Sequence, residues 1–297
     1  MIIQRPVQFA ITREDPNIEI ELIERHQAQS ALLVCSAGDT ILALKEKFPG
    51  MKVTAFDFNP KQIAHFERKA KGPYEVSLTQ LGNFEALFRT WANFFSEFIV
   101  KDAYMLFNSN KPFPKEIFAS PYWPVSFDLH FHDSFLRTMF GEAAIQHAPK
   151  GSYPRYFQRA FEKGLSRADY ATNPFLQHIF LDRFLDTPSY LSQLPDVGDV
   201  KLVTGGIDAI TTLASFDLLQ LSNIFDWSSG SEVRATCKRL SQEMKTGAVA
   251  LIRQINNDSP VADYLGPDFD IDHDLGKRFV ERDRSLFYSH IIVARKK

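Results

Sequence analysis

Cysteine is scarce in this chain: only Cys35 and Cys237 occur among 297 residues, and neither belongs to a CxxC pair. A disulfide framework and a zinc knuckle are therefore excluded, and we expect a protein of the reducing cytoplasm. A large excess of charge of one sign is also lacking, because the formal net charge is only −2. Nucleic-acid binding depends on an excess of Lys and Arg at the phosphates, so we expect no nucleic-acid partner.

Long hydrophobic runs are missing as well. No window approaches the roughly 18 consecutive apolar residues of a membrane-spanning helix, and the first 15 residues do not resemble a secretion signal. Any membrane contact is therefore expected to be peripheral, at the inner face of the membrane. Hydrophobic residues nevertheless make up 44% of the chain and charged residues 24%, which is the composition of a globular protein with a substantial core.

Short apolar runs alternate with helical patterns near both ends of the chain. The alternation predicts a Rossmann-like α/β fold with a doubly wound sheet. Strands are predicted over residues 31–35, 52–56, 200–204, 216–221, 248–255 and 285–294, and helices over 40–48, 60–71 and 232–244.

About 130 residues separate the second and third predicted strands, far more than a crossover helix needs. We interpret residues 78–197 as a helical insertion, and residues 1–77 and 198–297 as the Rossmann-like domain. Many of the 27 phenylalanines lie in this insertion. They form either its own core or the lining of an apolar substrate cleft.

The first predicted strand leads into Ser36-Ala37-Gly38, and the second ends on Asp57, 19 residues after Gly38. This is close to the usual spacing of about 20 residues between a glycine turn and an acid that binds ribose hydroxyls. The turn has one glycine and no GxGxxG, which argues against a pyrophosphate cofactor such as NAD. S-adenosylmethionine has no phosphate and needs only one close backbone approach, a ribose acid and polar strand ends. We therefore predict an S-adenosylmethionine site, with Gly38 unable to carry a side chain because its backbone approaches the ligand.

The remaining polar strand ends belong to the same edge of the predicted sheet. Ser222, Asn223 and Asp226 follow the fourth strand, where they either contribute to the site or begin a helix as caps. The residues predicted to bind S-adenosylmethionine are Cys35, Ser36, Ala37, Gly38, Asp57, Asn59, Gly205, Ile207, Ser222 and Asn223.

Several segments, in this order, resemble the S-adenosylmethionine:diacylglycerol 3-amino-3-carboxypropyltransferase family of betaine-lipid synthesis. They are Glu14-Asp15-Pro16, Ser36-Ala37-Gly38, Asp57-Phe58-Asn59-Pro60 with Gln62, Asn173-Pro174-Phe175, and Leu221-Ser222-Asn223-Ile224-Phe225-Asp226-Trp227. The resemblance implies a methyltransferase-type fold that transfers the aminocarboxypropyl group of S-adenosylmethionine to a hydroxyl or amine acceptor, such as a diacylglycerol-like lipid.

Such a transfer needs a base for a hydroxyl acceptor, since the nucleophile attacks the γ-carbon of the methionine moiety and methylthioadenosine leaves. His178, His132 and Asp226 are the candidate catalytic residues, with His130 beside His132. Each histidine also has a structural interpretation. We expect no metal ion. Two alternatives stay open: a methyltransferase, which releases S-adenosylhomocysteine, and a protein that binds S-adenosylmethionine without turnover.

Overall fold

A computed structural model describes residues 7–109 and 111–297. It is an α/β structure around a mixed seven-stranded sheet with strand order β3-β2-β1-β4-β5-β7-β6. The first five strands in this order are parallel, whereas β7 is antiparallel to both β5 and β6. The strands are β1 (Ser30–Val34), β2 (Lys52–Asp57), β3 (Lys201–Thr204), β4 (Leu218–Gln220), β5 (Val249–Gln254), β6 (Phe269–Ile271) and β7 (His290–Lys296).

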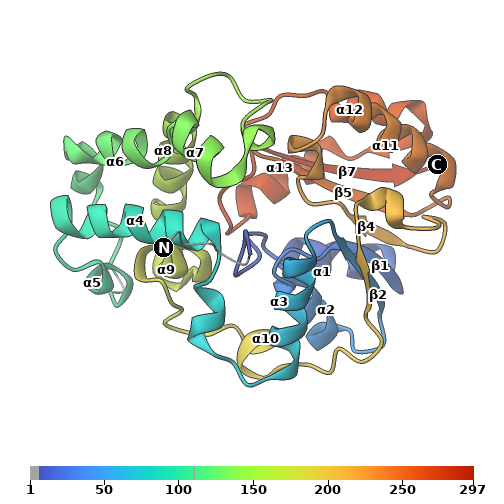
Figure 1. Cartoon of the computed structure of the whole chain (residues 1–297), viewed down its shortest axis with the longest axis horizontal. Coiled ribbons are helices and arrows are strands. Elements are labelled where there is room, and N and C mark those ends of the chain that lie inside the picture. Colours follow the sequence, from blue (N-terminus) through green and yellow to red (C-terminus); the bar gives the residue numbers. More distant parts are fainter. Residues whose placement is uncertain (1–6, 110) are drawn as a thin grey trace.

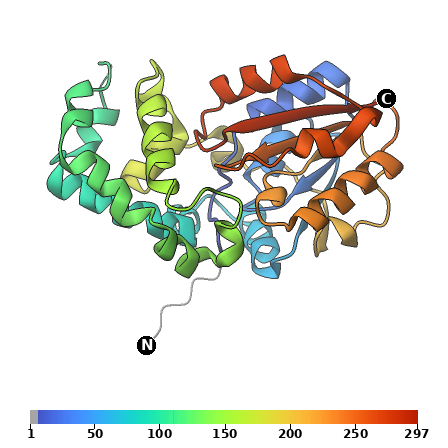
Figure 2. The ribbon, with the colours of Figure 1, turned by 90° about the horizontal axis from the view of Figure 1, so that it is seen from above.

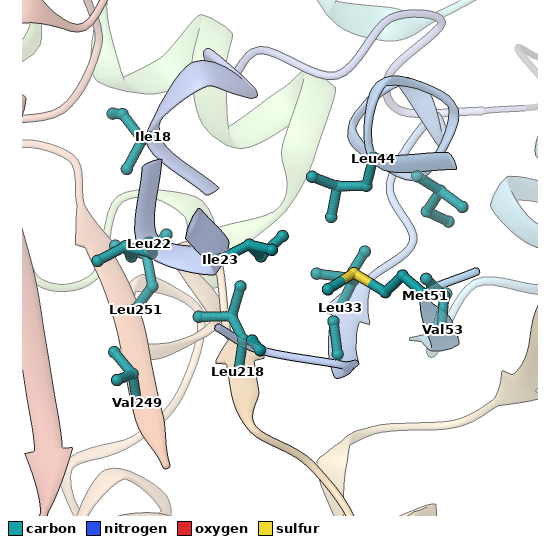
Figure 3. Close-up of a cluster of buried hydrophobic side chains, with 14 of the residues drawn as sticks. Ile18, Leu22, Ile23, Leu33, Leu44, Met51, Val53, Leu218, Val249 and Leu251 are labelled. Carbon is teal, nitrogen blue, oxygen red and sulfur yellow. The ribbon is translucent and has the colours of Figure 1, made fainter. Parts of the chain in front are cut away.

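Helices cover both faces of the sheet because alternate residues of its central strands are apolar on both sides. One face packs on α1 (Asn17–His26), α2 (Asp39–Lys47), α3 (Pro60–Lys71) and α13 (His273–Arg282), and the other on α11 (Gly230–Glu243) and α12 (Val261–Leu265). In β1, Leu33 faces the first group and Leu32 the second. Figure 3 shows how Leu22 and Ile23 of α1 lie near Leu218 and Leu251 of the central strands.

Between β2 and β3 the described residues form helices and no strand. After α3 these are α4 (Asn83–Phe98), α5 (Ala103–Phe107), α6 (Tyr122–His130), α7 (Asp133–Phe140), α8 (Tyr153–Leu165), α9 (Pro174–Leu181) and α10 (Ser189–Ser192). Both views of the chain place α4 to α9 as a group at one side of the sheet (Figures 1 and 2). The last helix before β3, α10, instead packs on α2, and its Leu191 belongs to the core of the sheet.

The aromatic residues of this helical group mostly form their own core. Trp91 of α4 packs against Phe95, Phe127 and Phe161 with ring centroids 4.7–5.5 Å apart, and all four side chains are fully buried. Leu286 and Phe287, just before β7, join this core and connect it to the sheet. For these aromatics the structure supports the core interpretation.

Strand ends differ from the predicted ones where tertiary contacts decide them. The last strand begins at His290 and not at Ser285, because Leu286 and Phe287 turn toward the helical group. The three-residue edge strand β6 was not predicted, since its Asp270 is exposed and the run is too short to show periodicity. None of the helices in the described residues is long and apolar enough to cross a membrane.

Short 3-10 turns complete the chain. They are η1 (Val76–Thr79), η2 (Lys115–Ala119), η3 (Glu142–Ala144), η4 (Tyr170–Thr172), η5 (Ile207–Ala209), η6 (Ile224–Asp226) and η7 (Gly266–Asp268). The turn η6 follows β4 at the carboxyl edge of the sheet and carries Asp226.

Candidate functional site

The turn after β1 is tightly held at the carboxyl edge of the sheet. Ser36 and Gly38 have φ values of 47° and 81°, and the Gly38 amide donates to the Cys35 carbonyl oxygen at 2.7 Å. Helix α3 fixes the other side of the turn, because the Gln62 side chain donates to the Ser36 carbonyl oxygen at 2.8 Å and Lys69 Nζ to that of Ala37 at 3.0 Å. The turn backbone is therefore fixed before any ligand binds.

Gly38 cannot carry a side chain, but the structure gives a reason that differs from the predicted one. A Cβ atom built there would lie 2.0 Å from Cδ2 of Phe66 in α3, and the backbone is in the left-handed region. The glycine is thus required for packing of α3 on the turn. A larger residue at this position would disturb the fold itself and would not test ligand binding cleanly.

Cys35 and Ala37, the other two predicted ligand residues of this turn, are buried. Burial raises the pKa of the Cys35 thiol far above its usual range, with the nearby Asp57 carboxylate as a smaller cause. The thiol therefore stays neutral, and these residues can offer a ligand only their backbone atoms.

Asp57 ends β2 directly beside the turn. Its Oδ2 accepts from the Ser36 amide at 3.0 Å and its Oδ1 from the Asn59 amide at 2.9 Å. Burial raises the pKa of Asp57 to about 6, although the two amides lower it. The next residue, Phe58, is 76% exposed. An exposed aromatic residue thus follows the carboxylate directly in the chain at the end of β2.

Asn59, Gly205 and Ile207 have local structural roles in addition to any contact with a ligand. The Asn59 side chain caps α3 by accepting from the Lys61 amide. The Gly205 amide, after β3, donates to the Asp57 carbonyl oxygen at 2.9 Å. The Ile207 carbonyl oxygen accepts from Arg239 of α11 at 2.7 Å.

The end of β4 contributes Ser222, with a φ of 51°, and the turn η6. Asp226 is not a helix cap: its carboxylate accepts from the Ile255 amide and the Asn257 side chain at 2.8 Å, and from Asn223 at 3.2 Å. It therefore joins the segments that follow β4 and β5. Burial raises the pKa of Asp226 to about 6.

A small cavity of about 40 Å³ lies between Asp226 and the helical group. Asn223 and Asp226 line one side of it. The other side is mostly apolar and aromatic, from Phe84, Leu136, Phe140, Tyr153 and Phe157. At this place, in contrast to the aromatic core around Trp91, phenylalanines line a hollow, which is too small for a substrate.

An N-terminal segment crosses the same edge, in a role that was not predicted from the sequence. Glu14 accepts from Tyr288 Oη and Arg253 Nη1 at 3.2 Å, and also from the side chains of Gln220 and Ser222. The hydroxyl of Ser222, predicted to bind the ligand, is therefore bonded to Glu14. One sequence signal was available: Arg253 is the one charged residue of β5, whose first four residues are all apolar.

The three histidines have different surroundings. His178 in α9 is buried, and its Nδ1 lies 3.2 Å from Nη2 of Arg13. Burial, and then the Arg13 charge, hold the pKa of His178 well below its usual value, so the imidazole is neutral. His132 is exposed and caps α7 by accepting from the Ser134 amide, while His130 bonds to the Ser126 carbonyl oxygen. Among the described residues that line the cavity there is no histidine.

Comparison with models of known protein families and with curated proteins finds no match for this chain. The functional argument therefore rests on the site itself. The structure brings the Ser36–Gly38 turn and Asp57 into direct contact. Just before this turn, Val34 of β1 donates its amide to Oε1 of Gln220 in β4 at 3.0 Å.

Proposed function

We propose that this chain binds S-adenosylmethionine across the carboxyl ends of β1, β2 and β4. The observation that carries the proposal is the contact between the Asp57 carboxylate and the Ser36 amide, at the point where the sheet order turns from β2-β1 to β1-β4. In open α/β sheets, ligands bind at such a switch point, beyond the carboxyl ends of the strands. A strand-end carboxylate there suits two ribose hydroxyls.

Three further features support a nucleoside ligand. Phe58, the residue after Asp57, is exposed, and its ring offers a flat apolar surface on which an adenine base can stack. Ser36 and Ser222 both have left-handed backbones at adjoining strand ends, and such strained residues cluster at ligand sites. The mixed sheet with helices on both faces is consistent with the Rossmann-like class, in which nucleosides bind at the carboxyl edge.

The proposed reaction is transfer of the 3-amino-3-carboxypropyl group to a hydroxyl or amine acceptor, with a diacylglycerol-like lipid as one candidate. This part rests on the family resemblance of the sequence. The acceptor oxygen or nitrogen would attack the γ-carbon, the carbon–sulfur bond would break, and methylthioadenosine would leave with the electron pair. The acceptor's proton would pass to a base, for which Asp226 is the candidate because it lines the cavity and has a pKa near 6.

The test has two parts. Calorimetry with S-adenosylmethionine should show binding, and Asp57→Ala should weaken it by roughly 1–3 kcal/mol through the lost hydrogen bonds to a charged group. Incubation of the protein with labelled S-adenosylmethionine and a lipid extract should release methylthioadenosine. Release of S-adenosylhomocysteine would instead identify a methyltransferase, and binding with neither product would identify a protein without turnover. Absence of binding would refute the proposal.

A further inference from the structure

Arg13 lies on the N-terminal segment between the two halves of the candidate site. On one side, the Thr12 amide donates to Oδ2 of Asp39 at 2.6 Å, in the first turn of α2. On the other side, Glu14 is bonded to Gln220 and Ser222 at the end of β4. The backbone at Arg13 therefore crosses the edge of the sheet between the turn after β1 and the end of β4.

The guanidinium of Arg13 is buried with only part of its hydrogen-bonding capacity used. Its exposed fraction is 5%, and its Nη2 atom meets Glu85 Oε1 at 3.1 Å and His178 Nδ1 at 3.2 Å. Its Nε and Nη1 atoms have no partner within the described residues. Phe88 lies under the guanidinium, with its ring centroid 5.1 Å from Cζ. A buried charged donor without an acceptor is costly, so these N–H groups call for an acceptor from outside the chain.

The second buried arginine of the site, Arg253, differs from Arg13 in how its charge is compensated, although its Nε and Nη2 atoms also have no partner within the described residues. Nη1 of Arg253 lies 2.7 Å from Glu19 and 3.2 Å from Glu14, and these carboxylates raise the pKa of Arg253 far above its usual value in spite of burial. Arg13 has one carboxylate partner, Glu85, which also accepts from the Ala10 amide. Burial accordingly lowers the pKa of Arg13, and Glu85 only partly offsets this effect.

We propose that Arg13 binds the α-carboxylate of the methionine moiety of S-adenosylmethionine through its free N–H groups. The inference rests on the proposed function and adds to it the residue that recognises the amino-acid end of the ligand. A carboxylate matches a buried guanidinium in charge and accepts charge-assisted hydrogen bonds. His178 is then a positioning residue: because Arg13 always donates, the Nδ1 atom of His178 must accept, which holds the guanidinium against α9.

The experiment compares three ligands by calorimetry on the full chain: S-adenosylmethionine, S-adenosylhomocysteine and methylthioadenosine. The first two carry the α-carboxylate, and the third is the same nucleoside without it. Arg13→Gln should weaken binding of the first two by about tenfold or more, as expected for a hydrogen bond to a charged group. Binding of methylthioadenosine should change by no more than about twofold. Arg89→Gln is the matched control, since Arg89 of α4 pairs with Asp182 and should leave all three affinities unchanged.

If Arg13→Gln does not fold, the double variant Arg13→Met, Glu85→Gln replaces it, because removing both members of a buried ion pair avoids an uncompensated charge. Equal weakening of all three ligands would show that Arg13 only shapes the fold, and unchanged affinities would show that water satisfies its N–H groups. Either result overturns the inference while the wild-type chain still binds nucleosides. A wild-type chain that binds none of the three overturns the proposed function as well.

Discussion

Replacing Asp226 by Asn tests the centre of the site through its pH dependence. Asn keeps the shape of the side chain but has no charge, so it resembles the protonated acid. Burial raises the pKa of Asp226 from 3.8 to about 6, a rise of about two units. The native protein therefore holds this proton up to about pH 6, whereas the unfolded chain releases it near pH 4. The stability that Asp226 contributes is present below pH 4 and is lost as the pH rises to 6, by about 3 kcal/mol in total.

The variant lacks this loss but has a weaker set of hydrogen bonds. The wild-type carboxylate accepts from Ile255, Asn257 and Asn223, and an amide NH₂ in place of one oxygen must face one of these donors. This costs roughly 1–3 kcal/mol. The free energy of unfolding, measured with urea from pH 4 to pH 8, should therefore be lower for Asp226→Asn at pH 4. Between pH 4 and pH 7, the free energy of unfolding of the variant should rise relative to that of the wild type by up to about 3 kcal/mol.

A difference that stays constant over this range would show that Asp226 does not have the raised pKa that its burial implies. Methylthioadenosine release at pH 7.5 is measured on the same samples. We expect a reduction of at least about tenfold, or roughly 1.4 kcal/mol, in a variant that remains folded. Full activity would remove Asp226 from the chemistry and leave it with the structural role of joining the segments after β4 and β5.

Three further predictions concern the rest of the edge. Affinity for S-adenosylmethionine should fall by up to about tenfold per pH unit below the Asp57 pKa of about 6, because ribose hydroxyls donate to the ionised form, and Asp57→Asn should flatten this profile in calorimetry. Gly38→Ala should destabilise the fold by roughly 2–5 kcal/mol in urea titrations, whereas Gly50→Ala, whose Cβ meets nothing within 4 Å, should not. Truncating Phe66 to Leu should restore part of the Gly38→Ala loss, and no restoration would refute the steric argument. Arg253→Met should lower the free energy of unfolding by roughly 3–5 kcal/mol in thermal denaturation, since it leaves the buried carboxylates of Glu14 and Glu19 unpaired. An unchanged stability would show that these carboxylates take up protons instead.

The polar edge of the site was only partly predictable. The Ser36–Gly38 turn and Asp57 follow directly from strand ends and turn chemistry, and the structure places them in contact. The surroundings of His178 were not predictable, because they come from distant segments: Arg13 and His178 are 165 residues apart in the chain. The contact between Glu14 and Arg253 was not predictable for the same reason, because these residues are 239 positions apart.

The sequence by itself determined the α/β class and the positions of β1, β2, β5 and the helices that follow the first two strands. These elements depend on local apolar periodicity and on caps such as Asn59 before Pro60, which act within a few residues. Only the tertiary structure decided that the N-terminal segment crosses the carboxyl edge, that Gly38 is required by Phe66, and that Asp226 joins two segments and caps no helix. Such contacts depend on how buried charges and rings meet across the fold, and a one-dimensional pattern does not carry that information.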